Sequence, residues 1–112
     1  MKYNFLPEET VEHFTILTQI CKEICPDCRF SLVDSEGNEV WCSLPETLLE
    51  EMDGGDEEYV LEVWETSQRQ NKLAWFGIMP YEPDGVCWDC GSSETGEKIF
   101  KLYFERINAD AL

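Results

Sequence analysis

The chain has 112 residues and carries 24 Asp and Glu against 8 Lys and Arg, which gives a formal net charge of −16. This charge argues against direct binding to DNA, RNA or an anionic membrane, because neutralising phosphates requires clustered Lys and Arg. Apolar residues at 43% and aromatic residues at 12% exclude a disordered chain, and the length suits one domain. The N-terminus lacks the long apolar core of a signal peptide, so we expect a cytoplasmic protein.

The first part of the chain predicts a long helix followed by a β-hairpin. Apolar residues recur at helical spacing from Pro7 to about Ile24, and Glu8 and Glu9 favour a first helical turn. Residues 29–34 and 39–43 predict two strands around a turn at residues 35–38, which contains Gly37.

The middle of the chain predicts a short second helix. The run from Ser43 to Glu46 has the Ser-x-x-Glu form of a capping box, with Pro45 inside the first turn. The helix then covers residues 46–52, and Gly54 and Gly55 end it.

Three later segments, 58–65, 73–79 and 98–107, predict strands because they are rich in β-branched and aromatic residues. In the last of them, Phe100, Leu102 and Phe104 alternate with Lys101, Tyr103 and Glu105. Residues 81–97 contain Pro, Gly and Ser and predict a long loop.

The predicted order is α-β-β-α-β-β-β, within a single acidic domain over residues 1–112. This order indicates an α+β fold with a mostly antiparallel sheet of about five strands, one long N-terminal helix packed on a face, and one short helix. We expect the long helix to pack on the sheet face that carries Phe100, Leu102 and Phe104. The helix residues expected there are Val11, Phe14, Leu17 and Ile24.

Two Cys-x-x-Cys pairs, Cys25 with Cys28 and Cys87 with Cys90, each place two thiolates about one tight turn apart. Together they offer four sulfur ligands for one tetrahedral metal ion. The forms Cys-Pro-x-Cys and Cys-x-x-Cys-Gly resemble the knuckles of zinc ribbons and rubredoxin-like sites. This resemblance implies a closed, structural Zn²⁺ site.

Other states of these cysteines stay open. A tetrad requires the end of the first helix to meet the late loop, since 58 residues lie between Cys28 and Cys87. The alternative is reduced, partly buried thiols, because free cysteine is among the most buried residue types; disulfides come third. A redox centre is disfavoured, because Cys25 lies at a helix C-terminus, where the helix dipole disfavours a thiolate.

The sequence lacks the common catalytic signatures. His13 is the only histidine, and neither Gly-x-Ser-x-Gly nor a phosphate-binding glycine loop with lysine is present. We therefore expect a binding protein and not an enzyme.

The stretch from residue 30 to residue 68 contains twelve acids and no Lys or Arg. Carboxylates at alternate strand positions lie about 6.6 to 6.8 Å apart, which is comparable with the spacing of phosphates along a nucleic-acid strand. This stretch predicts an acidic field that mimics nucleic acid and occupies a basic nucleic-acid-binding surface. The residues expected to bind that partner are Glu46, Glu50, Asp53, Asp56, Glu57, Glu58 and Glu62.

Small size, extreme acidity and the absence of catalytic motifs resemble the phage-encoded inhibitors of host defence, including anti-restriction and anti-CRISPR proteins. The resemblance is one of composition, and it implies an inhibitor that acts by binding. Two alternatives stay open. One is a zinc-stabilised adaptor that binds a protein through exposed aromatics such as Tyr81 and Trp88, and the other is an acidic domain whose charge serves solubility.

Overall fold

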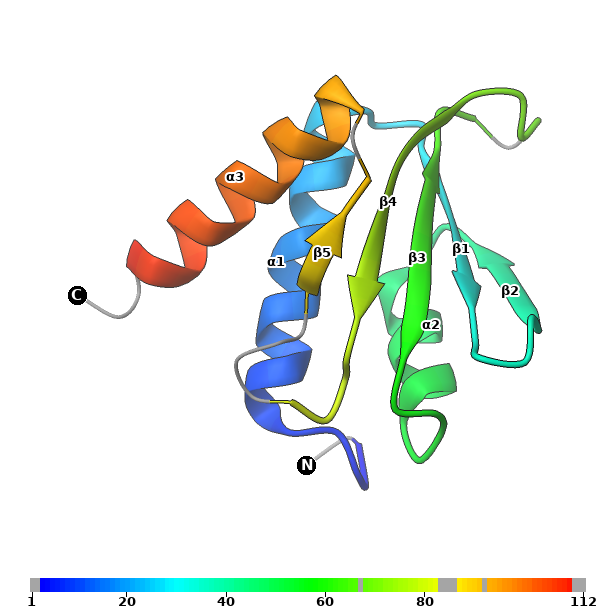
Figure 1. Ribbon diagram of the computed structural model, residues 1–112, viewed down its shortest axis with the longest axis vertical. Helices are drawn as coiled ribbons and strands as arrows, with labels where there is room; N and C mark the ends of the chain where they lie inside the picture. Colours follow the sequence, from blue (N-terminus) through cyan, green and yellow to red (C-terminus); the bar gives the residue numbers. More distant parts are fainter. Residues whose placement is uncertain (1–2, 67, 83–86, 92, 110–112) are drawn as a thin grey trace.

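The computed structural model describes residues 3–66, 68–82, 87–91 and 93–109. The elements follow the order α1 (Glu8–Ile24), β1 (Arg29–Val33), β2 (Glu39–Cys42), α2 (Pro45–Met52), β3 (Tyr59–Trp64), β4 (Lys72–Ile78), β5 (Cys87–Cys90) and α3 (Glu94–Ala109). The strands form one antiparallel sheet in the order β2-β1-β3-β4-β5 (Figure 1). The predicted α+β fold, with its antiparallel sheet and long N-terminal helix, is confirmed. Within the described ranges, no helix is long and apolar enough to cross a membrane.

The helices lie on one face of the sheet. Figure 1 shows α1 and α2 behind the strands, with α3 crossing beside α1 at the β5 edge. The pairing register places Leu32, Leu61 and Phe76 in one row across β1, β3 and β4, and all three side chains are buried. Phe14 and Leu17 of α1 are fully buried in the same core. Alternate strand residues therefore form one side of a single hydrophobic core, and the apolar stripe of α1 forms the other.

The predicted strand at residues 98–107 is wrong, because this segment belongs to α3. Ile99 and Tyr103 are four residues apart and buried, as helical periodicity requires. The hydroxyl of Ser93 accepts a hydrogen bond from the backbone N–H of Gly96 at 3.0 Å, which caps the start of the helix. Phe104 is 38% exposed, so it does not form the sheet face that was expected to meet α1.

Two further details differ from the sequence predictions. The segment predicted as a long loop contains β5, in which Cys87 pairs with Ile78 and Cys90 pairs with Phe76; residues 83–86 and 92 of that segment lie outside the described residues. The capping box at Ser43 does not form, because the N-cap of α2 is Leu44 and no side chain caps it. Pro45 alone marks the start of this helix, where its missing N–H costs nothing.

The core assignment gives a stability prediction. Replacing Phe76 with Ala should lower the free energy of unfolding by about 3 to 5 kcal/mol, because a large cavity forms in the middle of the sheet. Phe104→Ala is the matched control, and it should cost only about 1 kcal/mol, since the ring is partly solvated and lies against the rings of Phe100 and Tyr103. Urea unfolding monitored by circular dichroism measures both values. Equal losses for the two variants would contradict this arrangement of the core.

Candidate partner-binding site

A groove of about 630 Å³ lies between α1 and α2. On α1 its lining residues recur every three or four positions, which places them along one stripe of the helix that faces α2. Apolar side chains line part of the groove: Tyr3, Val11, Pro45 and Leu49. Three carboxylates also line it: Glu8, Glu12 and Glu46.

The carboxylates lie at both ends of the groove. Glu8 and Glu12 belong to the first turns of α1, whereas Glu46 belongs to the first turn of α2. The two helices run in opposite directions (Figure 1), so these first turns are at opposite ends of the shared groove. A ligand lying along the groove would therefore meet negative charge at each end and apolar surface between.

The charge of the groove is not neutralised from within. Among the ion pairs of the described residues, none involves Glu8, Glu12 or Glu46. Lys22 also lines the groove, but its ammonium donates a hydrogen bond to the backbone oxygen of Cys28 at 2.7 Å. This cation is thus directed toward the backbone at the start of β1.

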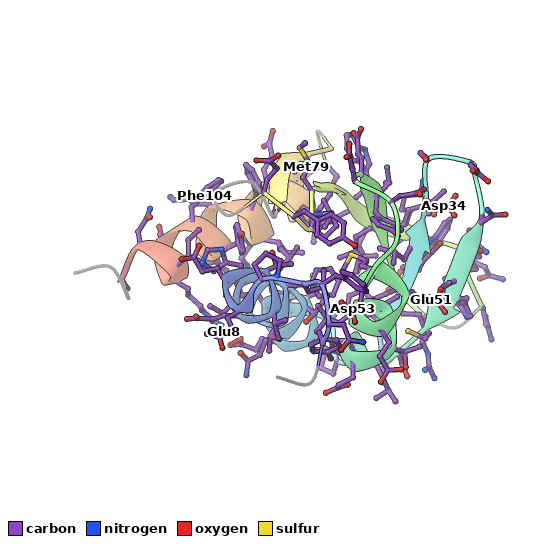
Figure 2. The ribbon with its side chains drawn as sticks, turned by 90° about the horizontal axis from the view of Figure 1, so that it is seen from below. Glu8, Asp34, Glu51, Asp53, Met79 and Phe104 are labelled. Atoms are coloured by element: carbon purple, nitrogen blue, oxygen red, sulfur yellow. The ribbon has the colours of Figure 1, made fainter. Side chains whose placement is uncertain are left out.

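Asp53 holds one wall of the groove in place. Its carboxylate accepts hydrogen bonds from the backbone N–H groups of Asn4, Phe5 and Leu6, at 2.9, 2.7 and 3.0 Å. These donors, led by Asn4, hold the pKa of Asp53 below its usual value. Figure 2 shows Asp53 and Glu8 at the end of the molecule where α1 begins and α2 ends. The segment that carries Tyr3 into the groove is therefore fixed to the end of α2.

The acidic residues expected to bind a partner do not form one row. Three of them already have partners within the chain. Asp53 accepts hydrogen bonds from the backbone of residues 4–6. The carboxylate of Asp56 accepts a hydrogen bond from the Ser35 hydroxyl at 2.8 Å, and Glu62 pairs with Lys72 at 2.7 Å. The other four are exposed in two places: Glu46 and Glu50 on α2, and Glu57 and Glu58 before β3. Of the seven, only Glu46 lines the groove.

Sequence reasoning missed Glu8 and Glu12 as site residues, because it assigned their end of α1 to the helix dipole. Their spacing of four places both on the same helix face, one position from Val11, and this was a readable signal. Tyr81, expected as an exposed aromatic contact, is half-buried and donates a hydrogen bond to the backbone oxygen of Met52 at 2.6 Å. The side chain of Trp88 lies outside the described residues.

The two cysteine pairs belong to different elements of the fold. Cys25 and Cys28 lie between α1 and β1, whereas Cys87 and Cys90 are on β5. In the sheet, β3 and β4 lie between β1, which follows the first pair, and β5, which carries the second. Within the ranges that the structure describes, no three His, Cys, Asp or Glu side chains are grouped to hold a metal ion. Zinc binding stays a prediction, and these positions do not supply its four ligands together.

Burial explains the properties of several cysteines without a metal. Cys21, Cys28 and Cys87 are buried in the core. Desolvation raises the pKa of Cys28 to about 11 and also raises the pKa of Cys21. These thiols are therefore held in the neutral form, which packs as a small apolar group.

Comparisons of the chain with protein-family models, with curated proteins and with solved structures found no match. The groove, its charge and its walls are therefore the basis for assigning a function.

The buried thiols give a pH prediction. The pKa of Cys28 is raised in the folded state, so the folded state favours the neutral thiol. The contribution of this thiol to folding stability is therefore complete below about pH 9 and is lost as the pH rises toward about 11. The free energy of unfolding of the reduced protein should therefore fall over this window, and Cys28→Val should make the fall shallower. Urea unfolding at a series of pH values measures it.

Metal analysis of the same sample separates this account from zinc binding. Zinc-bound thiolates would be deprotonated at neutral pH, so about one Zn²⁺ per chain together with stability that is flat from pH 9 to 11 would contradict the buried-thiol account.

Proposed function

We propose that the protein is a non-enzymatic binding protein that takes a basic amphipathic segment of another protein into the groove between α1 and α2. The observation that supports this is a largely apolar surface with carboxylates at both ends that form no ion pair among the described residues. Apolar side chains of such a segment would contact Val11 and Leu49. Its Lys and Arg side chains would reach Glu8, Glu12 and Glu46, as in other helix-in-groove complexes.

The dimensions suit a helical segment. On α1 the lining runs from Glu8 to Lys22, which is fourteen residue steps along the axis and corresponds to about 21 Å. A partner helix of four turns has this length.

The net charge of −16 favours the same partner class. An acidic protein attracts a basic partner over long range, raises the association rate and weakens its complex as salt screens the charges. A basic nucleic-acid-binding surface is one source of such a segment, and binding there would make the protein an inhibitor. The exposed carboxylates of Glu50, Glu57 and Glu58 would add steering to that encounter.

A matched pair of triple variants tests the groove. One carries Glu8→Gln, Glu12→Gln and Glu46→Gln; the control carries Glu36→Gln, Glu57→Gln and Glu58→Gln, which are exposed and do not line the groove. The probe is an amphipathic Leu/Lys helical peptide of about 18 residues, with affinity measured by titration calorimetry. Because both triples change the net charge equally, only position distinguishes them.

We expect the groove triple to weaken peptide binding about tenfold or more, and the control triple to weaken it about threefold or less. Val11→Asn, which adds a polar group to the apolar surface without changing charge, should weaken binding as well. Equal losses for the two triples would mean that charge alone attracts the peptide and that the groove is not its site.

A further inference from the structure

The face of the sheet opposite the helices carries three tryptophans. The register aligns Trp41, Ser31, Glu62 and Trp75 in one row across β2, β1, β3 and β4. Trp64 lies two positions after Glu62 on β3, so it is on the same face. The core residues Leu32, Leu61 and Phe76 alternate with this row on the other side. Partly exposed tryptophans on an uncovered sheet face are the kind of apolar surface that marks a binding site.

Two of these tryptophans enclose a cation of the chain itself. The guanidinium carbon of Arg69 lies 5.0 Å from the ring centre of Trp41 and 5.1 Å from that of Trp64. Both terminal nitrogens of Arg69 donate to the carboxylate of Glu39, and one of them lies 3.8 Å from Glu62. The planar cation is thus held by two indole faces and two carboxylates. We call Glu39, Trp41, Glu62 and Trp64 the guanidinium cage.

The cage residues belong to strands of the sheet, whereas Arg69, which occupies the cage, belongs to a connection between strands. The four cage residues are on β2 and β3, within the hydrogen-bonded sheet. Arg69 comes from the connection between β3 and β4, and 39% of its side chain is exposed. The rigid strands can therefore keep the cage in place when the Arg69 side chain leaves it.

Two features that lower folding stability lie at the guanidinium cage. Arg69 has a φ of 57°, and it is the sole non-glycine residue with positive φ in the described ranges. The indole N–H of Trp64 is buried without a hydrogen-bond partner. Strained backbone and unsatisfied buried groups concentrate at functional sites, where stability is given up for binding.

We propose that the guanidinium cage is a binding site for the guanidinium group of a ligand, and that Arg69 occupies this site until the ligand displaces it. The ligand is an arginine side chain of a partner protein or a small guanidinium compound. Indole faces attract a cation through their quadrupoles, and Glu39 offers the paired acceptors that a guanidinium fork requires. This site is on the opposite face of the sheet from the α1–α2 groove, so either can fail without the other.

Because Arg69 occupies the cage, it lowers the affinity that we expect for a guanidinium ligand. A ligand must compete with Arg69, so the apparent affinity of the unaltered protein is reduced by the fraction of molecules in which the cage is open. Removing Arg69 should therefore tighten binding. Lys72 provides the matched control, because its ammonium pairs with Glu62 at 2.7 Å and lies 5.3 Å from the Trp64 ring, outside the pair of indoles.

The first experiment titrates wild type, Arg69→Ala and Lys72→Ala with methylguanidinium, followed by tryptophan fluorescence and calorimetry. Each variant removes one positive charge from the same face, but only Arg69→Ala empties the cage. We expect Arg69→Ala to bind about tenfold or more tightly than wild type, and Lys72→Ala to resemble wild type. Tetramethylammonium, which has no N–H donors for Glu39, should bind the emptied cage more weakly. An equal gain in Lys72→Ala, or no saturable binding to Arg69→Ala, would overturn the proposal.

Two further arms identify the source of the guanidinium. Tighter binding of the blocked peptide Gly-Arg-Gly than of free arginine indicates a partner protein, and the reverse order indicates a small molecule; both results support the cage.

The second experiment uses the unaltered chain, so it does not depend on the folding of a variant. Nuclear magnetic resonance follows the side-chain Nε–H signal of Arg69 during titration with Gly-Arg-Gly. We expect this signal to move toward that of a solvated arginine, while the Arg106 signal stays fixed, because Arg106 pairs with Glu23 elsewhere. An Arg69 signal that does not move at saturating peptide would show that Arg69 is only a structural part of the sheet face.

Discussion

The fold depends on a sheet that helices cover on one face only. The row formed by Leu32, Leu61 and Phe76 is buried on the face that the helices cover, and burial of such side chains is the main source of stability in a domain of this size. The opposite face must stay compatible with water without a second layer. Both candidate sites follow from this arrangement, one between the covering helices and one on the uncovered face.

The distribution of charge also differs between the two faces of the sheet. On the uncovered face, Arg69 and Lys72 pair with Glu39 and Glu62, so acids and cations balance where the tryptophans are. On the helical side, the acids that line the groove have no such partners among the described residues. Carboxylates without an ion pair among the described residues are therefore present at an apolar groove.

Much of the fold was predictable because the signals are local. The apolar stripe of α1, the turn between β1 and β2, and the β-branched and aromatic residues of β3 and β4 each fit within a few neighbouring residues. The segment of α3 was ambiguous, since Phe100, Leu102 and Phe104 also alternate with polar residues. Glu97 and Lys101, four residues apart in the order that stabilises a helix, were the local sign that favoured α3.

The candidate site was less predictable because it depends on distant contacts. Asp53 is committed to residues 4–6, and Asp56 is committed to Ser35, through hydrogen bonds that no sequence period indicates. Arg69 directly follows the stretch that contains no Lys or Arg, yet it reaches back to Glu39 across the sheet. The count of acids indicates only that a basic partner is favoured, while the tertiary structure determines which acids remain available.

The central claim is that the groove between α1 and α2, and not the charge as a whole, binds a basic segment. The most direct measurement is a backbone amide footprint, in which the chemical shifts of the labelled protein are followed during titration with the amphipathic basic peptide. The account expects the largest changes along Glu8–Lys22 of α1 and in the first turn of α2, with Glu57 and Glu58 nearly unaffected. Changes spread evenly over all exposed acids, or centred on residues 57 and 58, would contradict it.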